Sequence, residues 1–300
     1  MRLRGIVLRV LGGFYRVHLP ERGEVVECRL AGKLKLQDGQ RSTGPVIVGD
    51  VVTVAKIEDS WVISGVEERR NELVRPMIAN VGTCVLVQSV TQPEPVLDLI
   101  DRVLLLATHR GIAVVICWTK VDLGVSPSVA GMIECYSAAG YPACLTSVVT
   151  GAGLEELAAL LGGQTSILAG PSGAGKSSLL NALCPTAAQT TGQISRKLQR
   201  GRQTTRHVEL LPLPGGGWLA DAPGFSKLDL LDIEVYELPH LYPEWRVPAQ
   251  RCRYADCRHA EEPDCAVKQA LAEGKIDRGR YQRYLSYLKE VEYNAQRRYQ

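Results

Sequence analysis

One short segment of the chain has the residue types and spacing of a phosphate-binding loop. Residues 170–177 read GPSGAGKS, which matches the pattern G-x-x-x-x-G-K-[ST]. The glycines allow successive backbone N–H groups to surround phosphate oxygens, and the positive end of the following helix adds to that attraction. We expect Lys176 to neutralise the β- and γ-phosphates and the Ser177 hydroxyl to bind Mg²⁺. The predicted phosphate-contacting residues are Gly170, Pro171, Ser172, Gly173, Ala174, Gly175, Lys176, Ser177 and Ser178.

A second segment, residues 119–122, predicts which purine the site recognises. It reads TKVD, follows an apolar run that ends at Trp118, and resembles the N-K-x-D motif of GTPases. The Asp122 carboxylate can accept two hydrogen bonds from N1–H and the 2-amino group of guanine, and adenine offers no such pair of donors. The Thr119 hydroxyl has one hydrogen-bond donor fewer than an asparagine amide, so we expect a looser tether between residues 119–122 and the phosphate loop. Ser147 is predicted to offer a backbone N–H to the base. The predicted base-contacting segment is Thr119, Lys120, Val121 and Asp122.

A third segment resembles the D-x-x-G element that follows a strand in GTPases. Asp221-Ala-Pro-Gly224 comes directly after the predicted strand 217–220. In this element the aspartate reaches Mg²⁺ through water and the glycine N–H senses the γ-phosphate. GTPases place a switch threonine between the phosphate loop and this element. We predict that Thr205 binds Mg²⁺ there, with Thr204 as the alternative.

The stretch around that threonine is basic. Residues 196–206 contain five cations and no acid, which favours contact with RNA phosphates; a solvated loop is the alternative. Phe225 stands where many GTPases have a glutamine that orients the attacking water, so slow intrinsic turnover is predicted. Gln203 is a candidate for that role, and it could equally be an RNA contact or a loop residue.

The order of these segments along the chain is itself informative. In ordinary GTPases the phosphate loop comes first and the base-reading motif last. Here residues 119–122 precede residues 170–177, which precede Asp221. A circular permutation preserves such a site, because the strands keep their neighbours in space. It also connects the chain after residue 231 directly to the D-x-x-G element, which is the second segment of a GTPase that moves on hydrolysis.

The C-terminal region carries a spacing typical of a metal site. Three cysteines and one histidine lie within fourteen residues, as C-x4-C-x-H-x5-C. Four protein ligands make a closed site, which suits structural Zn²⁺ and leaves no position for a catalytic water. Coincidental clustering is the alternative. The predicted ligands are Cys252, Cys257, His259 and Cys265.

A basic helix is predicted after the metal site. Its tyrosines, leucines and Val291 repeat at helical spacing, and its cations suit either RNA or the solvated face of a helix packed on the metal lobe. Those cations are Arg280, Arg283, Lys289, Arg297 and Arg298.

Three regions are expected to position these residues. Residues 1–72 contain about five short strands with glycine turns, which predicts a small β-barrel of OB type. Residues 73–231 alternate buried strands and helices, which predicts a parallel α/β sheet. Residues 232–300 are predicted to be mostly helical and metal-binding. The basic residues of the barrel region could line a nucleic-acid groove or be solvated; they are Arg2, Arg4, Arg9, Arg16, Lys33 and Lys35.

Composition limits the class of protein. The 300 residues are 45% hydrophobic and 22% charged with a net charge of +3, which excludes a mainly disordered chain. We find no apolar run of the roughly 18 residues that cross a bilayer. Arg9 interrupts the N-terminal apolar stretch before a signal peptide can form. Nine cysteines without paired spacing argue against a disulfide framework, so a cytoplasmic protein is predicted.

Taken together, these motifs resemble the ribosome small-subunit-dependent GTPase A family over essentially the whole chain. The matching segments are GPSGAGKSS, G-R-x-T-T at 201–205, D-x-P-G-F at 221–225 and the Cys/His spacing. The resemblance implies an OB-fold, a circularly permuted GTPase domain and a zinc domain. It also implies binding to the 30S subunit and 16S rRNA in late maturation, subunit-stimulated GTP hydrolysis coupled to release, Mg²⁺ with GTP, and a monomer.

This chain departs from the family pattern at two positions. Gln203 replaces the histidine of G-R-H-T-T, which leaves the water-orienting residue open, and Thr119 replaces the base-motif asparagine. Two alternative functions remain at this point. One is a P-loop ATPase or kinase, which Asp122 disfavours. The other is a nucleotide-gated RNA-binding module in which hydrolysis is incidental.

Overall fold

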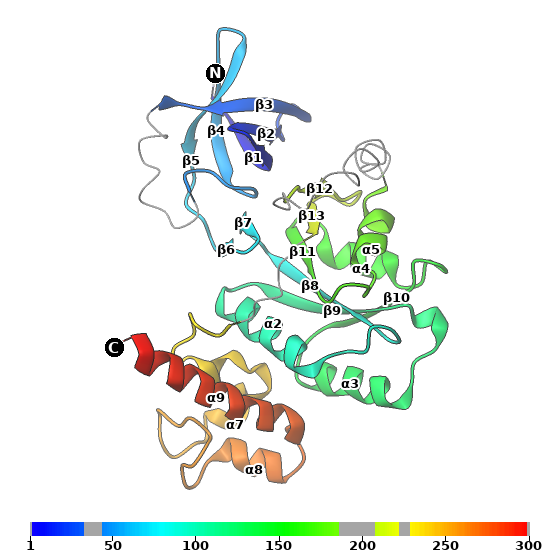
Figure 1. The fold of residues 1–300 in the computed structure, drawn as a ribbon, viewed down its shortest axis with the longest axis vertical. Helices are drawn as coiled ribbons and strands as arrows, with labels where there is room; N and C mark the ends of the chain where they lie inside the picture. Colours follow the sequence, from blue (N-terminus) through cyan, green and yellow to red (C-terminus); the bar gives the residue numbers. More distant parts are fainter. Residues whose placement is uncertain (1, 33–43, 186–207, 222–228, 299–300) are drawn as a thin grey trace. The chain divides into compact units, whose positions relative to one another are not determined.

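The computed structural model describes residues 2–32, 44–185, 208–221 and 229–298 (Figure 1). The chain divides into two compact units. The first contains residues 1–85, 147–169 and 175–226, and the second contains residues 86–146, 170–174 and 227–300. Strand β8 runs through the point where the first unit passes into the second.

Five N-terminal strands form a closed barrel in the order β1-β2-β3-β5-β4. Neighbouring strands are antiparallel except β3 and β5, which are parallel. Side chains alternate, so Leu3 and Val7 of β1 lie in the core while Arg2 and Arg4 are exposed. The predicted barrel is confirmed. Its strands are β1 (Arg2–Leu11), β2 (Phe14–Leu19), β3 (Glu24–Leu30), β4 (Val51–Ile57) and β5 (Ser60–Val66).

Several barrel cations are paired within the chain. Arg4 binds Glu67 with a bidentate contact of 2.7 Å, and Arg9 and Arg16 both bind Glu209 at 3.3 and 3.0 Å. Arg9 and Glu209 also form a β-bridge. Arg4 thus joins β1 to the residue after β5, and Arg9 and Arg16 join the barrel to the chain ahead of β12.

The parallel sheet follows the barrel, and its predicted α/β architecture is confirmed. The strand order is β10-β9-β8-β11-β13-β12. β10 runs parallel to β9 and β11 parallel to β13, while β12 is antiparallel. Every residue of β8 is buried, as expected for a strand covered on both faces. The strands are β8 (Thr83–Ser89), β9 (Ala113–Thr119), β10 (Ala143–Thr146), β11 (Thr165–Ala169), β12 (Leu211–Pro212) and β13 (Trp218–Asp221), and a two-stranded ribbon, β6 (Glu72–Val74) with β7 (Met77–Ala79), precedes them.

Helices connect the strands and form the C-terminal lobe. The Ser126 hydroxyl caps α3 at the Val129 N–H, and Pro127 occupies its first turn. The C-terminal lobe builds its core around Trp245 and Tyr284 and includes Leu105 of α2. The described helices are α2 (Leu97–His109), α3 (Pro127–Ala138), α4 (Leu154–Leu161), α5 (Lys176–Leu183), α7 (Arg246–Ala249), α8 (Ala266–Ala272) and α9 (Arg278–Arg298), with the 3₁₀ turns η1 (Val121–Leu123), η2 (Leu238–Leu241) and η3 (Pro243–Trp245).

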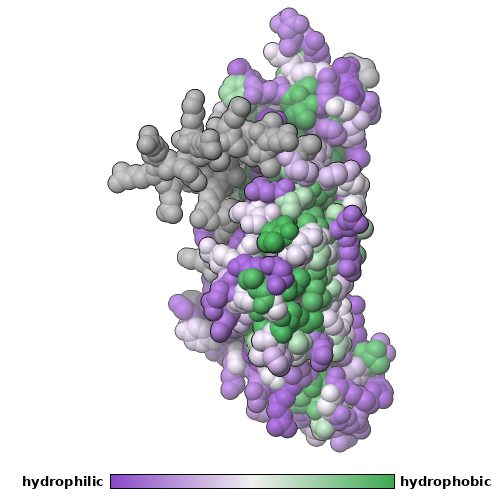
Figure 2. All heavy atoms as spheres, turned by 90° about the vertical axis from the view of Figure 1, so that its right-hand side faces the viewer, coloured by the Kyte–Doolittle hydropathy of each residue, from purple (hydrophilic) through white to green (hydrophobic). Residues whose placement is uncertain are grey.

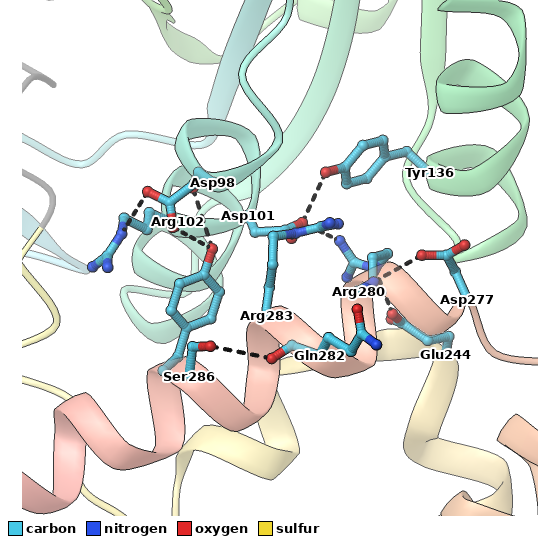
Figure 3. A network of polar contacts seen from close by, with 11 residues as sticks. Asp98, Asp101, Arg102, Tyr136, Glu244, Asp277, Arg280, Gln282, Arg283 and Ser286 are labelled. Atoms are coloured by element: carbon cyan, nitrogen blue, oxygen red, sulfur yellow. Dashed lines mark hydrogen bonds and ion pairs between the residues drawn. The ribbon is translucent and has the colours of Figure 1, made fainter. Parts of the chain in front are cut away.

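A buried ion network joins α9 to α2 (Figure 3). The Asp101 carboxylate accepts hydrogen bonds from Arg280, Arg283 and the Tyr136 hydroxyl, the last at 2.9 Å. Arg280 also donates to Glu244 at 2.8 Å, and the side chains of Asp101 and Arg280 are only 1% and 2% exposed. Burial, and then the charge of Asp101, raise the pKa of Tyr136 well above its usual value, so its hydroxyl remains a donor.

This network overturns one sequence interpretation. Arg280 and Arg283 were expected to suit RNA or a solvated face, but both are committed to Asp101. A partner 179 residues away along the chain leaves no signal in the local helix pattern.

Apolar surface is also present in the second unit. Leu123 ends η1, Val125 follows it and Leu145 lies on β10, and these side chains are 64%, 37% and 42% exposed. Figure 2 shows apolar surface gathered in the middle of the face turned toward the viewer.

Across the part of the chain that the structure describes, no helix has the length and apolar character needed to span a bilayer.

Candidate nucleotide site and metal centre

The phosphate loop leads from β11 into α5, as predicted. Gly170, Gly173 and Gly175 have φ angles of 135°, 82° and 98°, which side-chain-bearing residues rarely adopt. At Gly170 a Cβ atom would lie 2.2 Å from the carbonyl oxygen of Val87. The first glycine is therefore required both by its backbone conformation and by the close approach of the neighbouring strand.

Thr119 and Lys120 are fixed to this loop within the second unit. The buried Thr119 hydroxyl lies 2.6 Å from the Ala174 carbonyl oxygen and 3.2 Å from that of Gln88. Lys120 adopts a left-handed backbone with φ 63°, and its Nζ donates to the Gly173 carbonyl oxygen at 3.0 Å. The threonine therefore tethers the base-reading segment to the phosphate loop by a direct hydrogen bond, although its side chain is shorter than the expected asparagine.

The acid of the segment predicted to read the base, residues 119–122, lies at the surface. Val121 and Asp122 lie in η1 directly after β9, where Val121 is half-buried and Asp122 is exposed. Thr146 is paired with Thr119 across β10 and β9 and leads into Ser147. The Ser147 N–H donates to the Ala152 carbonyl oxygen at 3.0 Å, and its hydroxyl accepts from Val149 and Thr150. That N–H is thus engaged inside its own loop.

The remaining residues predicted for the nucleotide site lie at strand and helix ends of the first unit. Asp221 ends β13, where it is paired with Leu168 of β11. Lys176 begins α5 half-buried, and Ser177 and Ser178 follow it as exposed residues of the first turn. Donors at the start of a helix and an acid at the adjacent strand end suit a phosphate and its magnesium. Three predicted site residues, Gln203, Thr205 and Gly224, lie outside the described residues, as do Thr204, the stretch 196–206 and Phe225.

The four predicted metal ligands come together in the second unit. Their sulfur and nitrogen atoms all lie within 4.8 Å of one another. The His259 Nδ1 is 3.6 Å from the Cys252 sulfur and 3.4 Å from the Cys265 sulfur, and those two sulfurs are 4.0 Å apart. Zinc bonds of about 2.3 Å to sulfur and about 2.0 Å to nitrogen require ligand atoms about 3.5–3.8 Å apart in a tetrahedron. The geometry therefore fits one structural metal ion.

Neighbouring groups hold the ligand loop in that shape. Tyr281 donates to the His259 carbonyl oxygen at 2.8 Å, and Glu262 accepts from the Arg258 and Ala260 N–H groups at 2.9 Å. The Lys268 N–H points at the Cys265 sulfur at 3.5 Å. Burial raises the pKa of the Cys257 thiol to about 12. A cysteine must lose its proton to bind a metal ion, so metal binding releases protons.

Comparisons with known proteins place this architecture in a family. The family model described as RsgA GTPase matches residues 66–231, and RsgA N-terminal domain matches residues 4–61. The small ribosomal subunit biogenesis GTPase RsgA of Moorella thermoacetica is 44% identical over 290 residues, which covers 96% of this chain and 97% of that protein. The corresponding protein of Geobacillus kaustophilus is 43% identical with the same coverage.

Solved structures agree over the whole chain. YjeQ from Thermotoga maritima is 37% identical with a TM-score of 0.83, covering 97% of this chain and 99% of that one. YloQ, described as a circularly permuted GTPase, is 34% identical with a TM-score of 0.80, covering 97% and 96%. The barrel, the permuted order and the phosphate loop thus define a circularly permuted P-loop GTPase with an OB-fold. The chain belongs to the RsgA GTPase family, as the sequence motifs predicted.

Proposed function

We propose that this chain binds the 30S ribosomal subunit through 16S rRNA and acts in its late maturation. GTP hydrolysis is stimulated by the subunit and coupled to release, and the protein works as a cytoplasmic monomer. The observation that carries the proposal is the tether between the base-reading segment and the phosphate loop, through Thr119 and Lys120, in a chain 44% identical to a named small-subunit biogenesis GTPase.

Each site residue has a role in this proposal. The loop from Gly170 to Ser178 holds the phosphates, and Lys176 offsets their charge in the transition state. Ser177, Thr205 and Asp221 would hold Mg²⁺, which would supply positive charge to the phosphates during hydrolysis. Val121 and Asp122 complete the guanine site with Ser147 and its loop, and Gly224 faces the γ-phosphate. Gln203 positions the attacking water.

Each of the three regions, 1–72, 73–231 and 232–300, has its own role in this proposal. Residues 1–72 form an RNA-binding barrel, residues 73–231 hydrolyse GTP, and residues 232–300 form a zinc-binding domain. Cys252, Cys257, His259 and Cys265 hold one Zn²⁺, which stabilises the lobe and takes no part in hydrolysis because all its positions are filled. The separate barrel core supports the first region. The Cys/His cluster lies in a second core, which also includes Leu105 of α2.

Base recognition is tested by Asp122→Asn. An amide donor complements the C2 oxygen of xanthine, so the variant is expected to lose GTP affinity and gain affinity for xanthosine triphosphate. The affinities for GTP, ATP and xanthosine triphosphate are measured for both proteins, with the exposed barrel-turn variant Asp59→Asn as the matched control. Unchanged GTP affinity in Asp122→Asn, or preference of the wild type for ATP, contradicts the guanine site.

A further inference from the structure

A cavity in the C-terminal lobe lies beside the metal centre and belongs to no part of the nucleotide site. Its volume is about 450 Å³, and its lining includes Tyr242, Trp245, Arg246, Gln250 and Tyr254 together with the metal ligands Cys257 and His259. Cavities of this size take ligands as large as a nucleoside. All of its lining comes from the second unit.

The aromatic residues of this cavity are rigidly held. Tyr242 and Trp245 stack with ring centroids 4.2 Å apart and an interplanar angle of 12°, and Trp245 meets the His259 ring edge-on at 5.5 Å. Tyr254 lies between two metal ligands in sequence and remains 41% exposed. The lining therefore combines two buried rings that stack on each other, Tyr242 and Trp245, with one accessible tyrosine, Tyr254.

Polar groups of the cavity favour an electron-rich ligand. No acidic residue is among the described residues that line it, whereas Arg246 is. The Arg253 guanidinium lies 5.6 Å from the centre of the Tyr254 ring and is also paired with the exposed Asp264 at 2.9 Å. Trp245 Nε1 is buried without a hydrogen-bond partner in the described part of the chain, and this atom can only donate.

We propose that this cavity binds an unpaired RNA nucleobase. Aromatic faces stack bases, arginines beside them bind the adjoining phosphates, and a base supplies the carbonyl and ring-nitrogen acceptors that Trp245 can meet. The inference rests on the proposed function, because that function brings the chain to rRNA. It adds a defined contact on the metal lobe, with Tyr254 as the stacking residue.

The test uses the full-length chain and an eight-nucleotide single-stranded RNA that carries one 4-thiouridine. After irradiation, the cross-linked peptide is identified by mass spectrometry. The proposal predicts a cross-link within residues 239–259 that is retained in Tyr254→Phe. It also predicts that the yield at low RNA concentration falls about 5- to 100-fold in Tyr254→Ala, as loss of one base stack implies.

Tyr236→Ala is the matched control, because Tyr236 is a 70% exposed tyrosine that does not line the cavity. The metal content of each variant is measured to verify that the lobe is intact. Cross-links confined to other segments, or equal yields in Tyr254→Ala and Tyr236→Ala, overturn the proposal. Because no subunit or GTP is present, this result is independent of whether subunits stimulate hydrolysis.

Discussion

Replacing Asp101 with asparagine is expected to weaken the joint between α9 and α2. The substitution keeps the side-chain volume but removes the charge that faces Arg280 and Arg283. Arg280 then retains Glu244 as its ionic partner, and Arg283 loses the ion pair that holds it. Breaking a buried pair by removing one partner costs about 3–5 kcal/mol, and the charge left without its partner here is that of Arg283, whose side chain is 22% exposed.

Hydrogen exchange measures this loss locally, which matters because a chain of several domains does not unfold in one step. At about 1.4 kcal/mol per tenfold change, amides of residues 97–109 and 278–298 should exchange roughly 100- to 4,000-fold faster in Asp101→Asn. The matched control is Glu292→Gln, which breaks an Arg258 pair of 2.7 Å whose side chains are 50% and 37% exposed. It should cost at most about 1 kcal/mol. Equal protection in the two variants would refute the reasoning, since it would mean that desolvation cancels the attraction within the network.

Three further outcomes follow from the structure. Gly170→Ala should abolish nucleotide binding, because its Cβ would lie 2.2 Å from the Val87 carbonyl oxygen. Gly131→Ala is the control: its Cβ would point into open space within α3, so the effect on protein stability should be neutral or stabilising. Equilibrium binding of a fluorescent GTP analogue distinguishes the two variants. One Zn²⁺ per chain is expected, and Cys257→Ser should lose the metal and unfold the lobe, because metal binding supplies about 10 kcal/mol or more in such sites; a stable metal-free variant contradicts this. Burial lowers the pKa of His18, whose ring lies 5.0 Å from Trp218. The barrel should therefore be most stable above the unfolded-state pKa of about 6.5 and should lose stability as the pH falls below that value. An NMR titration that gives His18 a pKa at or above about 6.5 would contradict this.

Local patterns in the sequence were sufficient to predict the phosphate loop and the metal ligands. Glycines at 170, 173 and 175 occupy backbone conformations that other residues avoid, so the spacing carries the geometry. The buried run of β9 likewise predicted the strand that ends at Thr119. Metal-ligand spacing is short-range too, and the four side chains converge as expected.

Contacts between distant segments could not be predicted in this way. Arg280 and Arg283 resemble solvated helix cations until α9 is packed against Asp101. The Thr119 hydroxyl reaches Ala174 because the phosphate loop approaches the strand end closely, a distance that no motif encodes. The roles of all the nucleotide-site residues remain predictions, and Gln203, Thr205 and Gly224 lie outside the described part of the chain.

The most direct test of the account is GTP hydrolysis measured with and without purified small ribosomal subunits. The account predicts slow release of phosphate by the free chain and strong stimulation by small subunits, with no stimulation by large subunits. Removal of residues 1–72 should leave the basal rate roughly intact and reduce the stimulation. A rate that is the same with and without small subunits would contradict the proposed function, and it would favour an RNA-binding module in which hydrolysis is incidental.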